Sequence, residues 1–184
     1  MAGALLIAAA CIALASASHA GAQDASAADD VHARVAAGDL VGALQRARDV
    51  HAPGLAARLE AEVLWSAGDL NGALAAAREG LVAAPNELAL ARLAADLSLA
   101  LDLAHEARRH VTSLARDVAL LPQGDSDRDW WLGQLAALES STSAAERALE
   151  ARDTALSRAR SLGSILIAAT LGALLVLLRP ERRA

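Results

Sequence analysis

The stretch that decides the fold is Leu59–Asn86, LEAEVLWSAGDLNGALAAAREGLVAAPN. Apolar residues recur at helical spacing on both sides of Gly68 and Asp69, which indicates two helices joined by a tight turn. Gly68 suits the left-handed conformation that ends a helix, and Asp69 can accept the free amide protons of the next helix. Pro85 cannot continue that second helix because it has no amide proton to donate. The stretch therefore predicts an antiparallel helical hairpin.

The hairpin pattern recurs along the chain. Residues 37–44 (AGDLVGAL) closely match residues 67–74 (AGDLNGAL). Residues 91–97 (ARLAADL) echo residues 57–63 (ARLEAEV) after a shift of about 34 residues, which is the period of tetratricopeptide repeats. On these motifs the chain resembles the tetratricopeptide repeat family. The residues that carry the resemblance are Gly68, Asp69, Ala73, Gly80 and Pro85.

The resemblance implies an all-α array of antiparallel helix hairpins over residues 29–121, and a groove that holds a segment of a partner protein. In this family the first helix of each pair lines the groove. Alignment to Gly68 and Pro85 then implies the partner-binding residues Arg58, Glu62, Trp65, Arg92 and Asp96, with Ser66, Leu99 and Ala100 at further groove positions. The alternative interpretation of the two Arg–acid repeats is a pair of surface i,i+4 ion pairs worth only ~0.3–0.5 kcal/mol each.

Composition supports helices. The chain is 55% hydrophobic and 2% aromatic, and alanine and leucine dominate it, so a β-rich fold is disfavoured. The net charge of -5 provides no basic surface for nucleic acid. We therefore expect an all-α protein whose partners are other proteins.

The N-terminal region predicts a secretory signal over residues 1–22, with an apolar run and an A-x-A-like site that predicts cleavage near Ala20. An uncleaved anchor or a lipidated Cys11 remains the alternative. Residues 23–28 are predicted to form a linker before the repeats. The expected helices after it are 29–37, 40–50, 55–67, 70–84, 87–100 and 103–121, with Asn86 capping the fifth and a distorted turn, or partly fused helices, near residues 101–102.

A second linker is predicted at residues 122–128, followed by a degenerate helix pair or stalk over residues 129–160. The first helix would end at Glu139, and Ser143 with Glu146 fits a capping box that starts the next one. The second helix continues without a breaker into an apolar segment.

The apolar segment predicts a C-terminal transmembrane helix over residues 161–178, because Leu162–Leu178 contains only two polar side chains and reaches ~25 Å as a helix. The basic tail of residues 179–184 fits a cytoplasmic flank. The expected topology is a single-pass protein of a bacterial-type inner membrane with its main domain in the periplasm. The alternative is a buried hydrophobic hairpin.

Two short motifs resemble metal sites but lack the required spacing. His105 and His110 are five residues apart, whereas a zinc-protease helix needs its two histidines four apart on one face. Asp125, Asp127 and Asp129 alternate like the start of a calcium loop, but Trp130 stands where that loop requires glycine. We expect no metal, no cofactor and no enzymatic activity.

Tryptophan is the only aromatic residue type in the chain. Trp130 and Trp131 diverge by about 100° on a helix, so one is expected to pack inward and the other to lie at a membrane surface or partner site. Packing between helices is the favoured interpretation for this pair, and Trp65 is treated as a core residue or a groove residue.

These features predict a non-enzymatic protein-interaction scaffold, tethered to the membrane and exposed outside the cytoplasm. The alternative function is a homo-oligomeric membrane stalk, in which Leu149 and Leu156 of the charged helix mediate self-association.

Overall fold

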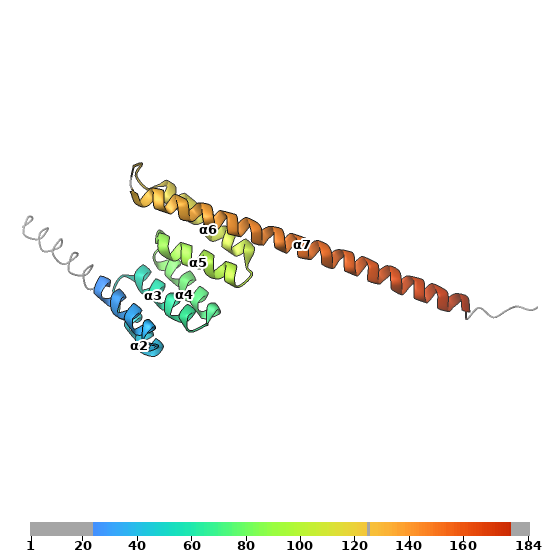
Figure 1. The fold of residues 1–184 in the computed structure, drawn as a ribbon, viewed down its shortest axis with the longest axis horizontal. Coiled ribbons are helices and arrows are strands. Elements are labelled where there is room, and N and C mark those ends of the chain that lie inside the picture. Colours follow the sequence, from blue (N-terminus) through green and yellow to red (C-terminus); the bar gives the residue numbers. More distant parts are fainter. Residues whose placement is uncertain (1–23, 125, 178–184) are drawn as a thin grey trace, which may run out of the picture. The chain divides into compact units, whose positions relative to one another are not determined.

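The computed structural model describes residues 24–124 and 126–177, with side-chain surroundings through residue 160. Within these ranges the chain forms helices and no strand, so the all-α prediction is confirmed (Figure 1). The chain divides into two compact units, of which the first ends at Thr142 and the second begins at Ser143.

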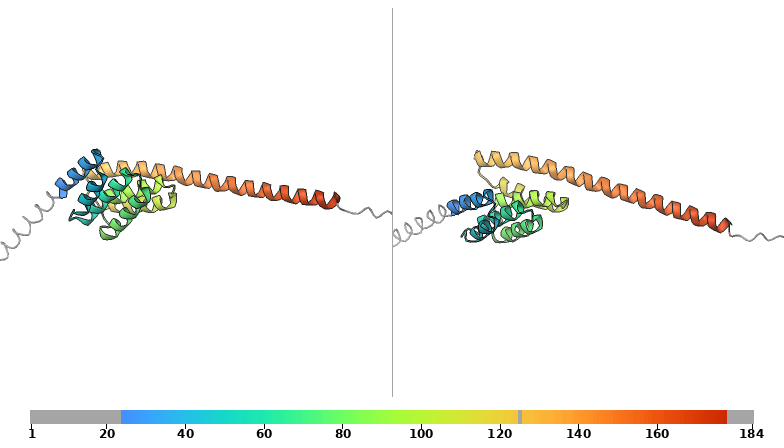
Figure 2. Two further views of the ribbon diagram at one scale, coloured as in Figure 1. Left: turned by 90° about the horizontal axis from the view of Figure 1, so that it is seen from below. Right: turned by 60° about the horizontal axis from the view of Figure 1, so that its bottom comes forward.

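The first unit is built from consecutive helices. Residues 24–36 are helical and are followed by α2 (Leu40–Arg48), α3 (Pro53–Ser66), α4 (Leu70–Ala83), α5 (Leu88–Ala100), α6 (Ala104–Ala119) and the start of α7 (Ser126–Leu177). Helix α3 packs against α4, and α5 packs against α6, each pair across a short turn. Contacts of α2 with α3, α4 with α5, and α3 with α5 join successive hairpins into one array (Figure 2).

The same turn closes three hairpins. Gly38 and Gly68 both have φ 81°, and Asp102 has φ 60° at the equivalent place in the third. In each turn the amide of the residue with positive φ donates to the carbonyl of the residue three positions earlier in the chain. The amide of the following residue donates to the carbonyl of the residue five positions before it. This pattern ends the first helix through a left-handed residue. The third turn is therefore regular, and α5 and α6 are separate helices, which corrects the sequence-based expectation of a distorted turn or fused helices. Asp102 can replace glycine here because aspartate tolerates the left-handed conformation better than most residues.

The helix caps differ between hairpins. The side chains of Asp39 and Asp69 accept hydrogen bonds of 2.9 Å from the amides of Gly42 and Gly72. Leu103 holds the equivalent position before α6 and provides no side-chain cap. The predicted cap of α5 by Asn86 is wrong, because the N-cap is Glu87 and its side chain makes no cap hydrogen bond.

Leu103→Asp is expected to stabilise the array by about 1 kcal/mol, the usual contribution of an N-cap carboxylate. Leu103 is 40% exposed and belongs to none of the three core clusters, so its replacement disturbs no core packing. Its φ of −97° and ψ of 59° resemble the −86° and 75° of Asp69, so aspartate fits without rearrangement. Urea unfolding followed by circular dichroism measures the gain. Leu103→Ala is the control, and an equal midpoint for the two variants would contradict the cap.

Three core clusters hold the array together. The first joins helix 24–36, α2 and α3, and its buried residues are Ala27, Val31, Ala43, Ala47, Val50, Leu59 and Val63. The second joins α3, α4 and α5, with Ala61, Ala73, Leu74, Ala77, Leu90, Leu93, Ala94 and Leu97. The third joins α5, α6 and the start of α7, with Ala91, Ala95, Val111, Leu114, Val118, Leu135 and Leu138. Each cluster crosses a hairpin boundary, so no hairpin buries its apolar face alone.

Two predicted segment boundaries are wrong. Residues 24–28 are not a linker but the start of the first helix, where Ala27 is buried and the carboxylate of Asp24 accepts a hydrogen bond from the amide of His51. The break predicted between Glu139 and the capping box at Ser143 is absent, because α7 is continuous from Ser126 to Leu177. Just before Ser143, the hydroxyls of Ser141 and Thr142 donate to carbonyls of the preceding turn of the same helix.

Glu106 connects α6 to α4. Its carboxylate accepts two hydrogen bonds from the guanidinium of Arg78, at 2.7 and 2.5 Å, and lies 3.5 Å from Nε2 of His110. The Arg78 hydrogen bonds hold the pKa of Glu106 below its ordinary value. Burial lowers the pKa of His110, against the attraction of Glu106. The histidine motif is therefore part of an interhelical ion network, and the described residues contain no group of side chains that could hold a metal ion.

We expect stability to fall in two steps as the pH is lowered. Because the pKa of His110 is lowered on folding, the unfolded chain takes up a proton first, below about pH 6.5. The contribution of Glu106 is present above its unfolded pKa, near 4.5, and is lost as the pH falls through its lower folded value. His110→Gln should remove the first step and leave the second. Urea midpoints measured from pH 8 to pH 3 test this, and an unchanged first step would contradict it.

Within the part of the chain that the structure describes, no helix combines the length and apolarity that crossing a membrane requires. The signal predicted for residues 1–22, and the side chains of the predicted spanning segment Leu162–Leu178, lie outside the described residues.

Candidate functional site

The first helices of the second and third hairpins, α3 and α5, contribute side chains to one surface of the array. In α3 these are Arg58, Glu62, Trp65 and Ser66, and in α5 they are Ala89, Arg92, Leu93 and Asp96. Trp130 and Trp131 join them from the start of α7. We call this surface the groove.

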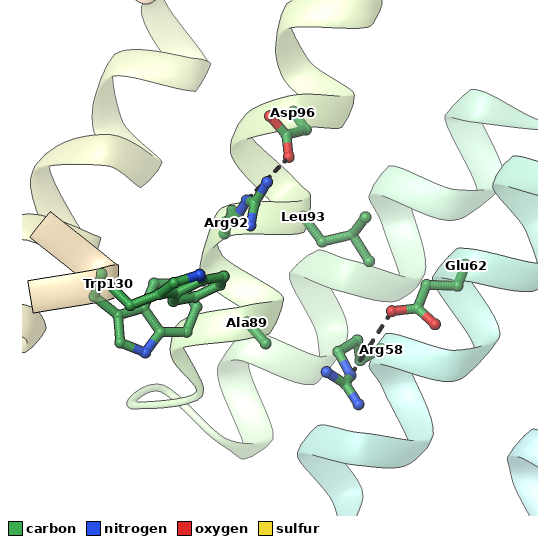
Figure 3. Close-up of a pocket in the computed structure, with 8 residues that line it drawn as sticks. Arg58, Glu62, Ala89, Arg92, Leu93, Asp96 and Trp130 are labelled. Atoms are coloured by element: carbon green, nitrogen blue, oxygen red, sulfur yellow. Dashed lines mark ion pairs between the residues drawn. The ribbon is translucent and has the colours of Figure 1, made fainter. Parts of the chain in front are cut away.

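The groove contains two hollows. An open hollow of about 340 Å³ is lined by Arg58, Glu62, Ala89, Arg92, Leu93, Asp96, Trp130 and Trp131 (Figure 3). A second hollow of about 510 Å³ is lined by Glu62, Trp65, Ser66 and Leu93. Glu62 and Leu93 line both hollows, so the two are neighbours along the array.

Charges in the groove are arranged in two rows. Arg58 and Arg92 lie one helical turn before Glu62 and Asp96 on their own helices, so the basic and acidic residues occupy successive levels. Figure 3 shows the two ion pairs on their adjacent helices, with Leu93 between them. The acidic row is contacted from the first helix, where Nε2 of His32 lies 3.0 Å from the carboxylate of Glu62.

The two arginine–carboxylate ion pairs of the groove are loose. Nε of Arg58 lies 3.8 Å from Glu62, and Nε of Arg92 lies 3.6 Å from Asp96, both longer than a hydrogen bond. Nε of Arg58 is buried and has no hydrogen-bond partner in the structure. Burial raises the pKa of Asp96, and the nearby Arg92 offsets this only in part. The Arg78–Glu106 pair outside the groove, by contrast, forms two short hydrogen bonds.

The three tryptophans of the chain all lie in the groove. Trp130 is 52% exposed and Trp65 is 41% exposed. Trp131 packs against the third core cluster, and its ring meets that of Trp130 edge to face at 4.7 Å between centroids. The guanidinium carbon of Arg92 lies 5.8 Å from the centre of the Trp130 ring, within cation–π range. Trp131 is thus the inward-packed member of the pair and Trp130 the exposed one, as expected for adjacent residues on one helix, and both line the hollow of about 340 Å³.

The structure brings together the five residues that the sequence analysis assigned to the groove. Ser66 joins them, but its hydroxyl donates to the carbonyl of Glu62 and is thereby occupied. Leu99, predicted at a further groove position, packs against the third core cluster instead.

Sequence reasoning missed His32, Ala89 and Leu93, and did not connect Trp130 with the groove. A signal for His32 was present in the sequence. His32, Glu62 and Asp96 each lie six residues before the left-handed residue of their own hairpin turn. No such register points to Trp130, because no hairpin turn of this kind follows it in α7.

Comparison with known proteins adds no relative: no protein-family model, no curated protein and no solved structure matches the chain.

Proposed function

We propose that this protein is a non-enzymatic interaction scaffold that binds a segment of a partner protein in the groove. The observation that carries the proposal is the position of the tryptophans. A chain with three aromatic residues has all of them in one groove, two of them more than 40% exposed. Tryptophan and arginine are the residue types most enriched among binding hot spots. A protein-binding groove accounts for their exposure, which core packing does not.

We further propose that the hairpins are tetratricopeptide-like repeats. The three equivalent turns support this, and so does the close approach of helices at Gly80, where an added Cβ would collide with Ala57 and Leu90. The proposed arrangement places the array outside the cytoplasm, tethered by Leu162–Leu178 as a single membrane span. The apolar sequence of that segment and the arginines after it support the tether.

Site-specific photocrosslinking in cells tests the proposed binding. A photoreactive amino acid at Trp65 or Ala89 of the full chain is expected to crosslink one partner protein. Val82 on α4, which is 86% exposed and lines neither hollow, is the matched control position. Trp130→Ala should reduce the crosslink at Ala89. Crosslinks of equal yield from Val82 and the groove positions, or none from the groove, would contradict the proposal.

Topology is tested by a reporter that is active only outside the cytoplasm. Fused after Gly124 it is expected to be active, and fused after Ala184 it is expected to be silent. Activity at neither position would place the array in the cytoplasm and refute the proposed location.

A second candidate function is a self-associating stalk formed by the second unit. The observation that favours it is the exposure of every residue from 151 to 160, including Leu156 at 48%. If the stalk associates, Leu149→Glu or Leu156→Glu should reduce the oligomer size of the full chain, whereas Trp130→Ala should not. Light scattering of the purified chain distinguishes the two.

A further inference from the structure

The groove combines three features that together define a kind of partner. It has a basic row, an acidic row, and apolar side chains between and beside them. Its arginine–carboxylate pairs are incompletely formed within the chain, as the 3.8 and 3.6 Å distances and the unpartnered Nε of Arg58 show, while Glu62 also has a 3.0 Å contact with Nε2 of His32. A partner that brings a carboxylate to the basic row and a cation to the acidic row would satisfy both.

The groove offers few neutral side chains that could hydrogen-bond the backbone of an extended peptide. An extended segment leaves its backbone amides and carbonyls to be hydrogen-bonded by the protein that binds it. Among the residues that line the two hollows there is no asparagine, glutamine or tyrosine, and the hydroxyl proton of Ser66 is already donated to the carbonyl of Glu62. A helix satisfies its own backbone and presents only side chains. The groove therefore favours a helical occupant.

We propose that the groove binds an amphipathic helix of a partner protein that carries acidic side chains along one edge of its apolar stripe and basic side chains along the other. This inference rests on the proposed function and names the partner that the groove selects. The apolar stripe contacts Leu93 and Trp130, the acidic edge meets Arg58 and Arg92, and the basic edge meets Glu62 and Asp96. Charges of both signs fix the direction in which the helix lies.

Three synthetic helical peptides without tryptophan, all of one composition, provide the probes. The first has glutamate along one edge of a leucine and alanine stripe and lysine along the other, with two prolines at its ends. The second intermixes the two charges on both edges. The third keeps the first charge pattern but moves the two prolines to its centre, which breaks the helix.

Intrinsic fluorescence of the full chain in an uncharged amphipol measures binding, because its tryptophans all lie in the groove. The edge-segregated peptide is expected to bind at least about tenfold more tightly than the other two. In the intermixed peptide some charges lie opposite groove charges of the same sign. In the peptide with central prolines the broken helix exposes backbone groups that the groove does not hydrogen-bond. Equal binding of the segregated and intermixed peptides would overturn the inference.

Charge-swap variants give a second, sharper readout. Arg58→Glu combined with Glu62→Arg keeps an i,i+4 pair and the net charge but interrupts both rows. This double variant should bind the edge-segregated peptide about tenfold more weakly than the native chain does. The corresponding swap of Arg92 and Asp96 should have the same effect. Swapping both pairs inverts both rows together, so a helix turned end for end again matches them. The fourfold variant is then expected to recover affinity to within about threefold of the native chain.

The outcomes separate this inference from the proposed function. If single swaps have no effect, or if the fourfold variant is as weak as the single swaps, the two-row model is wrong. If the peptide or charge-swap results contradict the two-row model while the groove positions still crosslink to a partner protein, the scaffold function stands. Only the proposed kind of partner is then refuted. Circular dichroism of each variant checks that the array remains folded.

Discussion

Leu90→Ala is expected to lower the free energy of unfolding of the array by about 3–4 kcal/mol, more than most single substitutions do. Leu90 is fully buried in the second core cluster, where α3, α4 and α5 meet. Half of that cluster consists of alanines, whose short side chains cannot move to fill the space left by leucine. The loss of side-chain contacts therefore remains as a cavity.

Thermal and urea unfolding of the full chain, followed by circular dichroism at about 222 nm, measure this loss. A drop of about 10 °C or more in the midpoint is expected for a domain of this size. Leu120→Ala is the matched control, because Leu120 is 80% exposed and its truncation should shift the midpoint by less than about 2 °C. A Leu90→Ala midpoint close to that of the control would mean that the second cluster does not hold the hairpins together.

Gly80→Ala is expected to destabilise the array by about 1–3 kcal/mol, although alanine is the better helix former by about 1 kcal/mol. An added Cβ at Gly80 would collide with the Cβ of Ala57 and lie 2.7 Å from Cδ2 of Leu90. Helix α4 would have to move away from α3, and the two helices of this hairpin would lose contact. The close approach therefore outweighs the intrinsic preference.

Two further variants isolate the cause of the Gly80 effect. Gly133 lies on an exposed face of α7 with open space where its Cβ would lie, so Gly133→Ala should stabilise by about 0.5–1 kcal/mol. Ala57→Gly with Gly80→Ala transfers a methyl group from α3 to α4. The pair should be less destabilised than the sum of the two single variants, because the main collision is removed. Gly80→Ala that stabilises like Gly133→Ala would refute the predicted collision.

The groove also accounts for an asymmetry among the ion pairs. Arg78 and Glu106 bind each other directly and tie α4 to α6, whereas the two groove pairs are held at longer distances on single helices. Exposed pairs of the second kind contribute little to stability. In the proposed function, their equivalent positions on α3 and α5 serve the recognition of charge, and the peptide and charge-swap experiments test this.

Much of the fold follows from the sequence alone. The hairpin at Gly68 and Asp69, its repetition at Gly38, and the helical period of the apolar residues are local properties of the backbone and of side-chain spacing. The two aspartate caps were predictable for the same reason, since each bonds an amide three residues away. The i,i+4 spacing of the two groove ion pairs also requires only the helix.

Other features were decided only by tertiary structure. The turn at Asp102 lacks the glycine signal, yet packing of α5 against α6 imposes the same left-handed backbone. Ser143 and Glu146 suggest a helix start in isolation, but α7 runs through them without a break, and the hydroxyls of Ser141 and Thr142 donate to carbonyls of the preceding turn of this helix. The sequence determined the helices, their turns and the charges that each one carries. Only the packing of distant helices decided that these charges form two rows and that Trp65 and Trp130 share one exposed groove, because a side chain's exposure depends on neighbours that local sequence does not specify.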